Sequence, residues 1–153
     1  MTLQTPGLQV QHEMLAPLSS RYIDVAALPW QPTRFPGVEI KVLMEDPQTG
    51  LQTVLTRMAP GAVLTDHMHV AVEQTWVLEG RLVDHEGTAT AGNFVWRPAG
   101  SRHEAWAGPE GNLSVAMFQL PNKFFQADGR ELDFLGKDWH EAWGIAAKAH
   151  ALA

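Results

Sequence analysis

Cysteine is missing from this chain of 153 residues. Without thiols the protein can form no disulfide, carry no cysteine nucleophile and offer no cysteinyl metal site. A bound metal would therefore have to use histidine and carboxylate ligands. The absence of cysteine also fits a reducing compartment, and we expect a cytoplasmic protein.

Long apolar runs and clusters of positive charge are missing as well. No stretch is apolar for long enough to predict a membrane-spanning helix, and the N-terminus shows no signal-peptide pattern. The 11 Lys and Arg against 17 Asp and Glu give a net charge of -6, and no Lys/Arg cluster exceeds two neighbours. Because nucleic-acid binding needs a basic patch, we expect neither a nucleic acid nor a membrane as partner.

Short β-type runs separated by turn residues make up most of the chain from Val38 onward, which is typical of a sandwich or barrel. Repeated prolines interrupt residues 1–37, so we expect an N-terminal arm with one outer strand over residues 20–26. The other expected strands cover residues 38–45, 51–58, 73–79, 81–85, 88–91, 94–97, 102–106, 112–120, 123–126 and 130–134.

A helical pattern follows over residues 137–153. Asp138 and Glu141 resemble a capping box, and an apolar stripe follows at helical spacing. The stripe consists of Trp139, Ala142, Trp143 and Ala146. We expect it to pack against the barrel or a second subunit. The chain shows no internal repeat, and we expect one domain overall, composed of an arm (1–37), a barrel (38–136) and a helix with its tail (137–153).

Three histidines and one glutamate recur at strand-and-turn spacing between Gly61 and His103. His67 and His69 differ by two positions, so on a strand both rings leave the same face. Glu73 shares their parity after a short turn, and His103 must approach from another strand. Neutral imidazoles with one carboxylate suit iron(II), zinc, nickel or manganese. We therefore predict a metal site formed by His67, His69, Glu73 and His103.

The alternative is that these four side chains are ordinary structural residues, or that the barrel kept them and lost its metal. Glycines and Pro98 stand where the turns of a barrel need them, which favours the metal site. The other histidines lie in polar stretches, in a turn or on the expected helix. We expect these four to be solvated: His12, His85, His140 and His150.

The spacing resembles the two cupin motifs. The first reads Gly61, His67-Met68-His69, Glu73 and Gly80, and the second reads Gly92, Pro98-Ala99-Gly100 and His103. The second motif usually ends with Asn four residues after its histidine, where this chain has Ala107. The resemblance implies an all-β fold, a single cupin double-stranded jelly-roll barrel, here followed by a C-terminal helix.

Further stretches, over residues 76–84, 91–94 and 98–104, resemble the ChrR-type subgroup of cupins, named after an anti-sigma factor. This subgroup includes a zinc-binding regulator domain and stand-alone dioxygenases. The Asp128-Gly129 turn and the tryptophan-rich residues 139–147 are similar to acetylacetone dioxygenase and 2,4'-dihydroxyacetophenone dioxygenase. The resemblance implies an iron(II) centre that uses dioxygen to cleave a carbon–carbon bond of a small β-diketone or hydroxyketone.

In this resemblance His67, His69 and His103 hold the metal, and Glu73 has a catalytic role. The regulator domain implies that Glu73 is a fourth ligand, whereas acetylacetone dioxygenase implies a carboxylate behind three histidines. Two other functions stay open. One is a metal-dependent isomerase or hydrolase using zinc or manganese, and the other is a small-molecule-sensing cupin. The family also implies a homodimer or a higher homo-oligomer.

Other side chains near the motifs have weaker claims to the site. Trp76 and Trp106 have the opposite parity to the predicted ligands and should face away from the metal. Met117 and Gln119 lie on the strand after the second motif and are expected either to line the pocket or to belong to the core. Two strand-end arginines are expected to form surface ion pairs, with contact to an anionic substrate as the alternative: Arg57 and Arg97.

Overall fold

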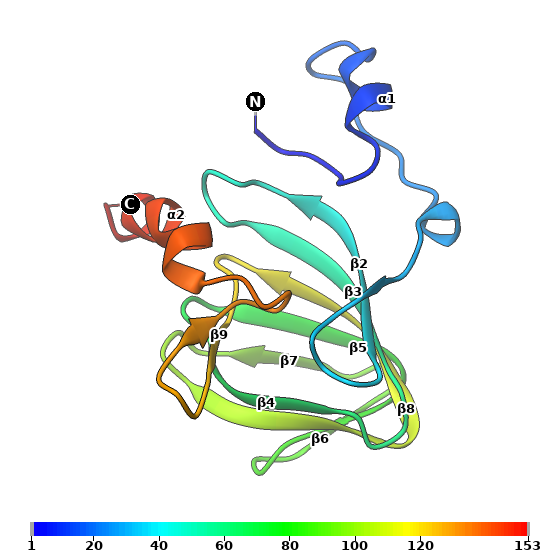
Figure 1. Cartoon of the computed structure of the whole chain (residues 1–153). Coiled ribbons are helices and arrows are strands. Elements are labelled where there is room, and N and C mark those ends of the chain that lie inside the picture. Colours follow the sequence, from blue (N-terminus) through cyan, green and yellow to red (C-terminus); the bar gives the residue numbers. More distant parts are fainter. Residues whose placement is uncertain (1, 153) are drawn as a thin grey trace.

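The computed structural model describes residues 2–152, and the side chains of residues 2–150. Antiparallel strands curl around one interior, and the terminal segments lie at one end of the curled sheet (Figure 1). The strands are β1 (Gln31–Pro32), β2 (Val38–Glu45), β3 (Gln52–Met58), β4 (Val63–Met68), β5 (Glu73–Val83), β6 (Thr88–Thr90), β7 (Phe94–Arg97), β8 (Arg102–Phe118), β9 (Lys123–Phe125) and β10 (Glu131–Leu132).

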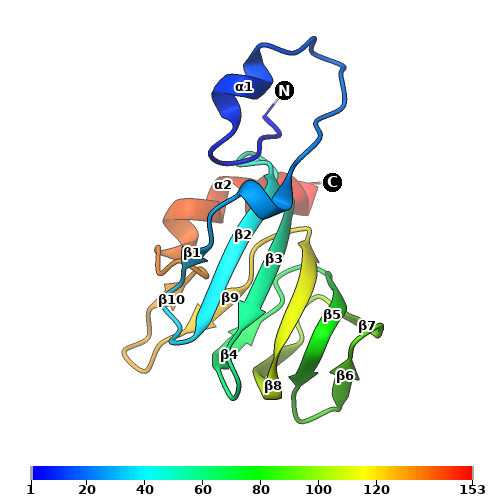
Figure 2. The ribbon, with the colours of Figure 1, turned by 90° about the vertical axis from the view of Figure 1, so that its right-hand side faces the viewer.

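Strand β8 organises the sheet because its two halves pair with different partners. The order along the main path is β1-β2-β3-β8-β4-β9-β10, and β5 pairs with β8, β6 and β7. The first half of β8 pairs with β4, and its second half lies between β3 and β5. Figure 2 shows this succession of strands from the side. The prediction of an all-β jelly-roll barrel with a C-terminal helix is confirmed.

Strands β5 and β8 change which side chains face the interior partway along their length. On β8, Ala105 and Ala107 are buried in the first half, whereas Ser114, Ala116 and Phe118 are buried in the second half. The register between the strands shifts between Val77 and Glu79 and again between Gly80 and Leu82. At such a register shift one strand contains an extra residue, and the side chains that follow it point to the other face of the sheet.

The interior divides into an apolar part and a polar part. One apolar cluster is centred on Phe35 and Phe124, whose ring centroids lie 4.8 Å apart, and the edge of Phe134 packs against both. A second cluster joins Ile40 to Phe118 across β2, β3 and β8. The polar part lies beside these clusters, where His67 stacks on the Phe124 ring at a centroid distance of 4.7 Å.

The C-terminal helix α2 (Trp139–Leu152) packs on the barrel as the apolar stripe predicts. Asp138 Oδ1 accepts a hydrogen bond from the Glu141 amide at 3.0 Å, which is the N-terminal half of the expected capping box. Trp139 is buried and donates its indole hydrogen to the Pro121 carbonyl. Ala146 packs against Ala71 and Leu120, so the helix covers the chain just beyond the barrel strands.

The strand expected over residues 20–26 is wrong. This part of the chain is largely exposed and contains only a short 3-10 helix, Val25–Ala27. The free edge of β2 is instead taken by β1, where Gln31 pairs with Ile40. A short helix α1 (Gln9–Glu13) precedes it and stands clear of the barrel in Figures 1 and 2. None of the helices within residues 2–152 is long and apolar enough to cross a membrane.

Candidate metal centre

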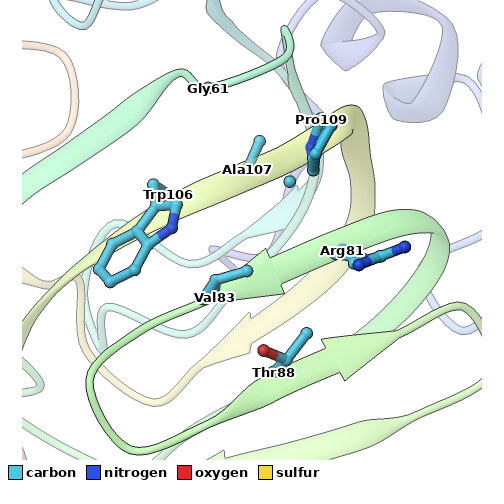
Figure 3. A pocket seen from close by; sticks show the side chains of 8 residues that line it. Gly61, Arg81, Val83, Thr88, Trp106, Ala107 and Pro109 are labelled. Carbon is cyan, nitrogen blue, oxygen red and sulfur yellow. The ribbon is translucent and has the colours of Figure 1, made fainter.

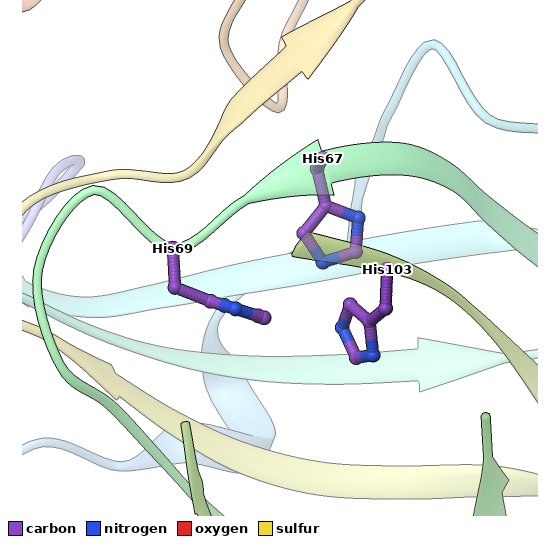
Figure 4. A group of neighbouring side chains, drawn as sticks. All are labelled: His67, His69 and His103. Carbon is purple, nitrogen blue, oxygen red and sulfur yellow. The ribbon is translucent and has the colours of Figure 1, made fainter. Parts of the chain in front are cut away.

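Three histidines meet inside the barrel, where strands β4 and β8 pair. His67 lies on β4 directly opposite His103 on β8, and His69 follows the end of β4. Each ring offers a nitrogen, and these three atoms lie within 4.8 Å of one another. Figure 4 shows the rings turned toward a common point. All three side chains are buried, with exposed fractions of 2%, 1% and 7% for His67, His69 and His103.

The Nδ1 atoms of His67 and His69 are held by oxygen atoms of the chain. His67 Nδ1 lies 2.8 Å from the Thr65 carbonyl, which can only accept a hydrogen bond. His69 Nδ1 lies 3.1 Å from the Ser101 carbonyl and 2.8 Å from its hydroxyl, and that hydroxyl donates to the Pro98 carbonyl. Both rings therefore carry their hydrogen on Nδ1, which leaves an Nε2 lone pair available to a metal.

His103 is held by a buried carboxylate rather than by a carbonyl. Its Nδ1 donates to Asp84 Oδ2 at 2.7 Å, and the same oxygen accepts from Arg97 Nη1 at 2.6 Å. Burial alone would raise the pKa of Asp84, but the hydrogen bond from His103 and the charge of Arg97 hold it below its ordinary value. Asp84 therefore stays ionised and fixes the His103 ring with Nε2 free, an arrangement common behind metal-binding histidines.

Burial keeps the rings of His67 and His103 neutral. It lowers the pKa of His67 from 6.5 to about 4, although the Thr65 carbonyl and Glu73 oppose the shift. Burial also lowers the pKa of His103, and Asp84 again opposes the effect. A metal needs the neutral ring, so these environments prepare ligands that are ready to bind without losing a proton near pH 7.

Glu73 lies beside the histidines but outside the group of three mutually close nitrogens. Its Oε2 is 3.1 Å from His69 Nε2, and yet, within residues 2–150, that Nε2 has no aligned hydrogen-bond partner. Burial would raise the pKa of Glu73, but the contact with His69, the nearby His67 ring and the charge of Arg97 together outweigh burial and hold this pKa below its ordinary value. The site thus combines three imidazole lone pairs with one carboxylate, a donor set that fits iron(II), zinc, nickel or manganese.

Trp76 and Trp106 are placed as predicted. Their exposed fractions are 50% and 37%, so both face away from the histidines. Figure 3 shows a surface pocket of about 350 Å³ beside Trp106, between β5, β6 and β8. None of the four predicted ligands lines this pocket, so it is separate from the candidate centre. The other four histidines lie away from the candidate metal centre: His12, His85, His140 and His150.

The two arginines differ in their surroundings. Arg57 forms the expected surface ion pair with Glu39, at 2.8 Å. The surface prediction is wrong for Arg97, whose side chain is 12% exposed and pairs with buried Asp84. Arg97 stands opposite Glu73 in the sheet, because β7 and β5 are neighbours in register, and it lines the space beside His67 and His103.

Met117 and Gln119 do not line the space beside the histidines. The inward positions of this part of β8 are Ser114, Ala116 and Phe118. The parity that holds at His103 does not continue past the register shifts with β5, so counting by twos from His103 gives the wrong face. After the same register shifts Asp84 lies on the inner side of the sheet, where it contacts His103. The sequence did not indicate this contact, because Asp84 stands in an ordinary turn pattern.

A curled antiparallel sheet with three histidines and a glutamate on its inner face is the arrangement of a cupin. The chain matches the family described as the ChrR cupin-like domain over residues 18–122, and it belongs to that family. The resemblance predicted from the motifs is therefore confirmed. A comparison with curated proteins finds no match.

Several solved structures share the fold. A presumptive acetylacetone dioxygenase from Methylibium petroleiphilum PM1 has a TM-score of 0.68 and 23% identity, covering 87% of this chain and 98% of that one. Acetylacetone dioxygenase from Acinetobacter johnsonii has a TM-score of 0.65 and 21% identity, covering 88% and 94%. The anti-sigma factor ChrR, bound to SigE of Rhodobacter sphaeroides, has a TM-score of 0.55 and 21% identity, covering 61% and 51%.

Proposed function

We propose that the protein is an iron(II)-dependent dioxygenase that cleaves a carbon–carbon bond beside a carbonyl of a small β-diketone or hydroxyketone. The observation that carries the proposal is the convergence of three buried imidazoles whose Nδ1 atoms are all committed to oxygen acceptors. The fold shared with acetylacetone dioxygenases supports the choice of reaction. The absence of cysteine leaves the metal as the evident source of reactivity.

His67, His69 and His103 would hold the iron through Nε2, and Glu73 would be the fourth ligand. When bound, the iron supplies Lewis acidity for the enolate charge of the substrate and the redox chemistry that dioxygen requires. The chain contributes rings fixed in one orientation and a buried setting. Asp84 keeps His103 in place and Arg97 holds Asp84, because a single carboxylate oxygen of Asp84 accepts a hydrogen bond from both side chains.

Glu73 is also placed to act as a base. Its lowered pKa keeps it a carboxylate at neutral pH, and it lines the space next to His67 and His103. In this role Glu73 accepts a proton from the substrate carbon next to a carbonyl, which in a β-diketone lies between two carbonyls, and the electron pair of that C–H bond is delocalised as the enolate. Arg97 stands opposite Glu73, and its positive charge helps to keep Glu73 ionised.

A metal-dependent isomerase or hydrolase is the second candidate. The observation that favours it is the same Glu73 carboxylate beside the unpartnered His69 nitrogen, because such a group can move protons without dioxygen. Zinc or manganese would be the metal in that case. A small-molecule-sensing role is a further alternative, in line with the ChrR relative.

Oxygen consumption separates these functions. Protein purified without added metal would be analysed for its metal, then loaded with iron(II) or with zinc and given acetylacetone in an oxygen electrode. We expect the iron form to consume oxygen together with the diketone, and the zinc form to consume none. Equal turnover of substrate under nitrogen would exclude a dioxygenase and favour an isomerase or hydrolase.

We also propose that the β-rich outer face supports a homodimer. Large apolar side chains are exposed on the outside of β5 and β7, and Trp76 stands opposite Phe94 there. The exposed group consists of Trp76, Leu78, Phe94 and Trp96. Exposed apolar surface of this kind is uncommon on a monomer. Light scattering should give twice the chain mass, and a monomer mass at every concentration tested would contradict the proposal.

A further inference from the structure

A second cavity lies behind the candidate metal centre, on the inner face of β2 and β3. Its volume is about 230 Å³, and polar side chains such as Gln52 and Lys137 stand among the residues that line it. For comparison, a cavity of roughly 150 Å³ in another protein holds benzene. The apolar side chains of β2, β3, β8 and residues 134–135 form one wall of this cavity: Ile40, Val42, Val54, Phe118, Phe134 and Leu135. We call it the substituent cavity.

The substituent cavity borders the space beside the histidines. Four residues line both spaces: Thr56, Phe118, Asn122 and Phe134. The space next to the histidines is small, about 40 Å³, and is also lined by His67, Glu73 and His103. A molecule bound at the metal centre outgrows this small space, and the substituent cavity is an adjoining space into which part of it can extend.

Asn122 is the polar group at this boundary. Its exposed fraction is 6%, and within residues 2–150 its side-chain oxygen has no hydrogen-bond partner. A buried amide oxygen without a partner is destabilising, so its presence needs a compensating role. Its neighbours hold it in position, because the Pro121 carbonyl accepts a hydrogen bond from Trp139 and the Phe124 ring is fully buried.

We propose that the substituent cavity receives an aryl or alkyl substituent of the substrate. Asn122 Oδ1 accepts a hydrogen bond from a hydroxyl group of the incoming substrate, which is the hydroxyl of a hydroxyketone or the enol hydroxyl of a β-diketone before its proton is lost. The inference rests on the proposed function and narrows its substrate class. The substrate is a β-diketone or hydroxyketone with a hydrocarbon group of about phenyl size on one side. Asn122 is a positioning and specificity residue, because its amide orients the oxygen-bearing end toward the histidines.

The test compares two diketones that differ in one substituent. Acetylacetone and benzoylacetone would be titrated calorimetrically into iron(II)-loaded protein under nitrogen, after its iron content has been measured. We expect benzoylacetone to bind at least roughly tenfold more tightly, since its phenyl group leaves water for an apolar cavity. Val42→Phe fills the cavity and should remove most of that preference. Val63→Phe makes the same change on an exposed part of β4 and should leave the preference intact.

Asn122→Leu tests the amide itself. The leucine has nearly the same size and removes the unpaired polar group, so the ligand-free variant should melt at a temperature equal to or above that of the unaltered protein. Its affinity for both diketones should fall roughly tenfold while its iron content stays the same. A lower melting temperature with unchanged affinity would show a structural role and overturn the assignment.

The outcomes also separate this inference from the proposed function. If iron-loaded protein binds neither diketone, the substituent-cavity inference and the proposed dioxygenase function are both wrong. If acetylacetone is bound and consumed with oxygen, but benzoylacetone binds no better and Val42→Phe changes nothing, the substituent cavity fails and the dioxygenase remains.

Discussion

The two ring nitrogens of each central histidine have separate tasks. Nδ1 of His67, His69 and His103 contacts a carbonyl, a serine or a carboxylate, and this contact fixes both the tautomer and the ring orientation. Nε2 is left for the metal. The motif spacing predicted which residues meet, because residues two apart on a strand share a face. The oxygen atoms that contact these rings could not be predicted. Every residue has a backbone carbonyl, and Asp84 reaches His103 only because the register of β5 shifts.

The role of Glu73 is decided by a variant that keeps its shape and removes its charge. Glu73→Gln should lower the affinity for iron roughly tenfold to a hundredfold and change the coordination spectrum of the iron form, if Glu73 is a ligand. Iron titration and near-infrared circular dichroism measure both effects. Glu104→Gln, at an exposed position next to His103, is the matched control. Lower affinity with an unchanged coordination spectrum in the Glu73 variant would place this carboxylate behind the ligands, because replacing a group there also weakens metal binding.

At the scale of elements, the paired strands β5 and β8 determine which side chains reach the interior. The short runs predicted the positions of β2 and β7 to the residue. The runs over 102–106 and 112–120, however, join into one strand, β8. Prediction failed where the register shifts, because a bulge depends on how two strands meet and not on the alternation within either. This explains why Ala116 and Phe118 line the pocket instead of Met117 and Gln119.

Gly80 is the position where this irregular pairing leaves least room. Its φ is +70°, and a β-carbon there would lie 2.0 Å from the Gly111 carbonyl oxygen. Gly80→Ala should therefore lower the free energy of unfolding by about 3 kcal/mol or more. Gly92→Ala is the matched control, because Gly92 also has a positive φ of +87° but nothing lies near its added carbon. Backbone strain alone should lower the free energy of unfolding of Gly92→Ala by about 1 kcal/mol.

Urea unfolding of the two glycine variants measures the difference. Equal losses of stability would show that the close approach of β5 and β8 does not constrain Gly80. A larger loss in Gly80→Ala than in Gly92→Ala, accompanied by weaker metal retention in Gly80→Ala alone, would link the irregular pairing to the placement of Asp84 and His103.

At the scale of the whole molecule, neutral histidines in the interior make folding sensitive to acid. Because burial lowers the pKa of His67 to about 4, the unfolded chain binds more protons than the folded chain between pH 6.5 and that value. The stabilising contribution is complete above about pH 6.5 and is lost as the pH falls. The free energy of unfolding of metal-free protein should drop by about 2–3 kcal/mol between roughly pH 7 and pH 4.5.

Denaturant titrations across this pH range test that expectation. His67→Gln removes the titrating ring and should show a shallower dependence on pH, whatever its stability at neutral pH. A solvated histidine offers a comparison, since His85→Gln changes an exposed side chain and should keep the dependence of the unaltered protein. Stability that is constant from neutral pH down to pH 4.5 would contradict a neutral, buried His67.

The metal geometry tests the central claim most directly. Crystals of iron-loaded protein, with anomalous diffraction at the iron edge, would locate the ion relative to the histidines. We expect one iron per chain, at roughly 2.0–2.2 Å from Nε2 of His67, His69 and His103, and replacement of any one of them by alanine should remove most of the iron. An ion bound elsewhere or through Nδ1, or full iron content in all three alanine variants, would contradict the account.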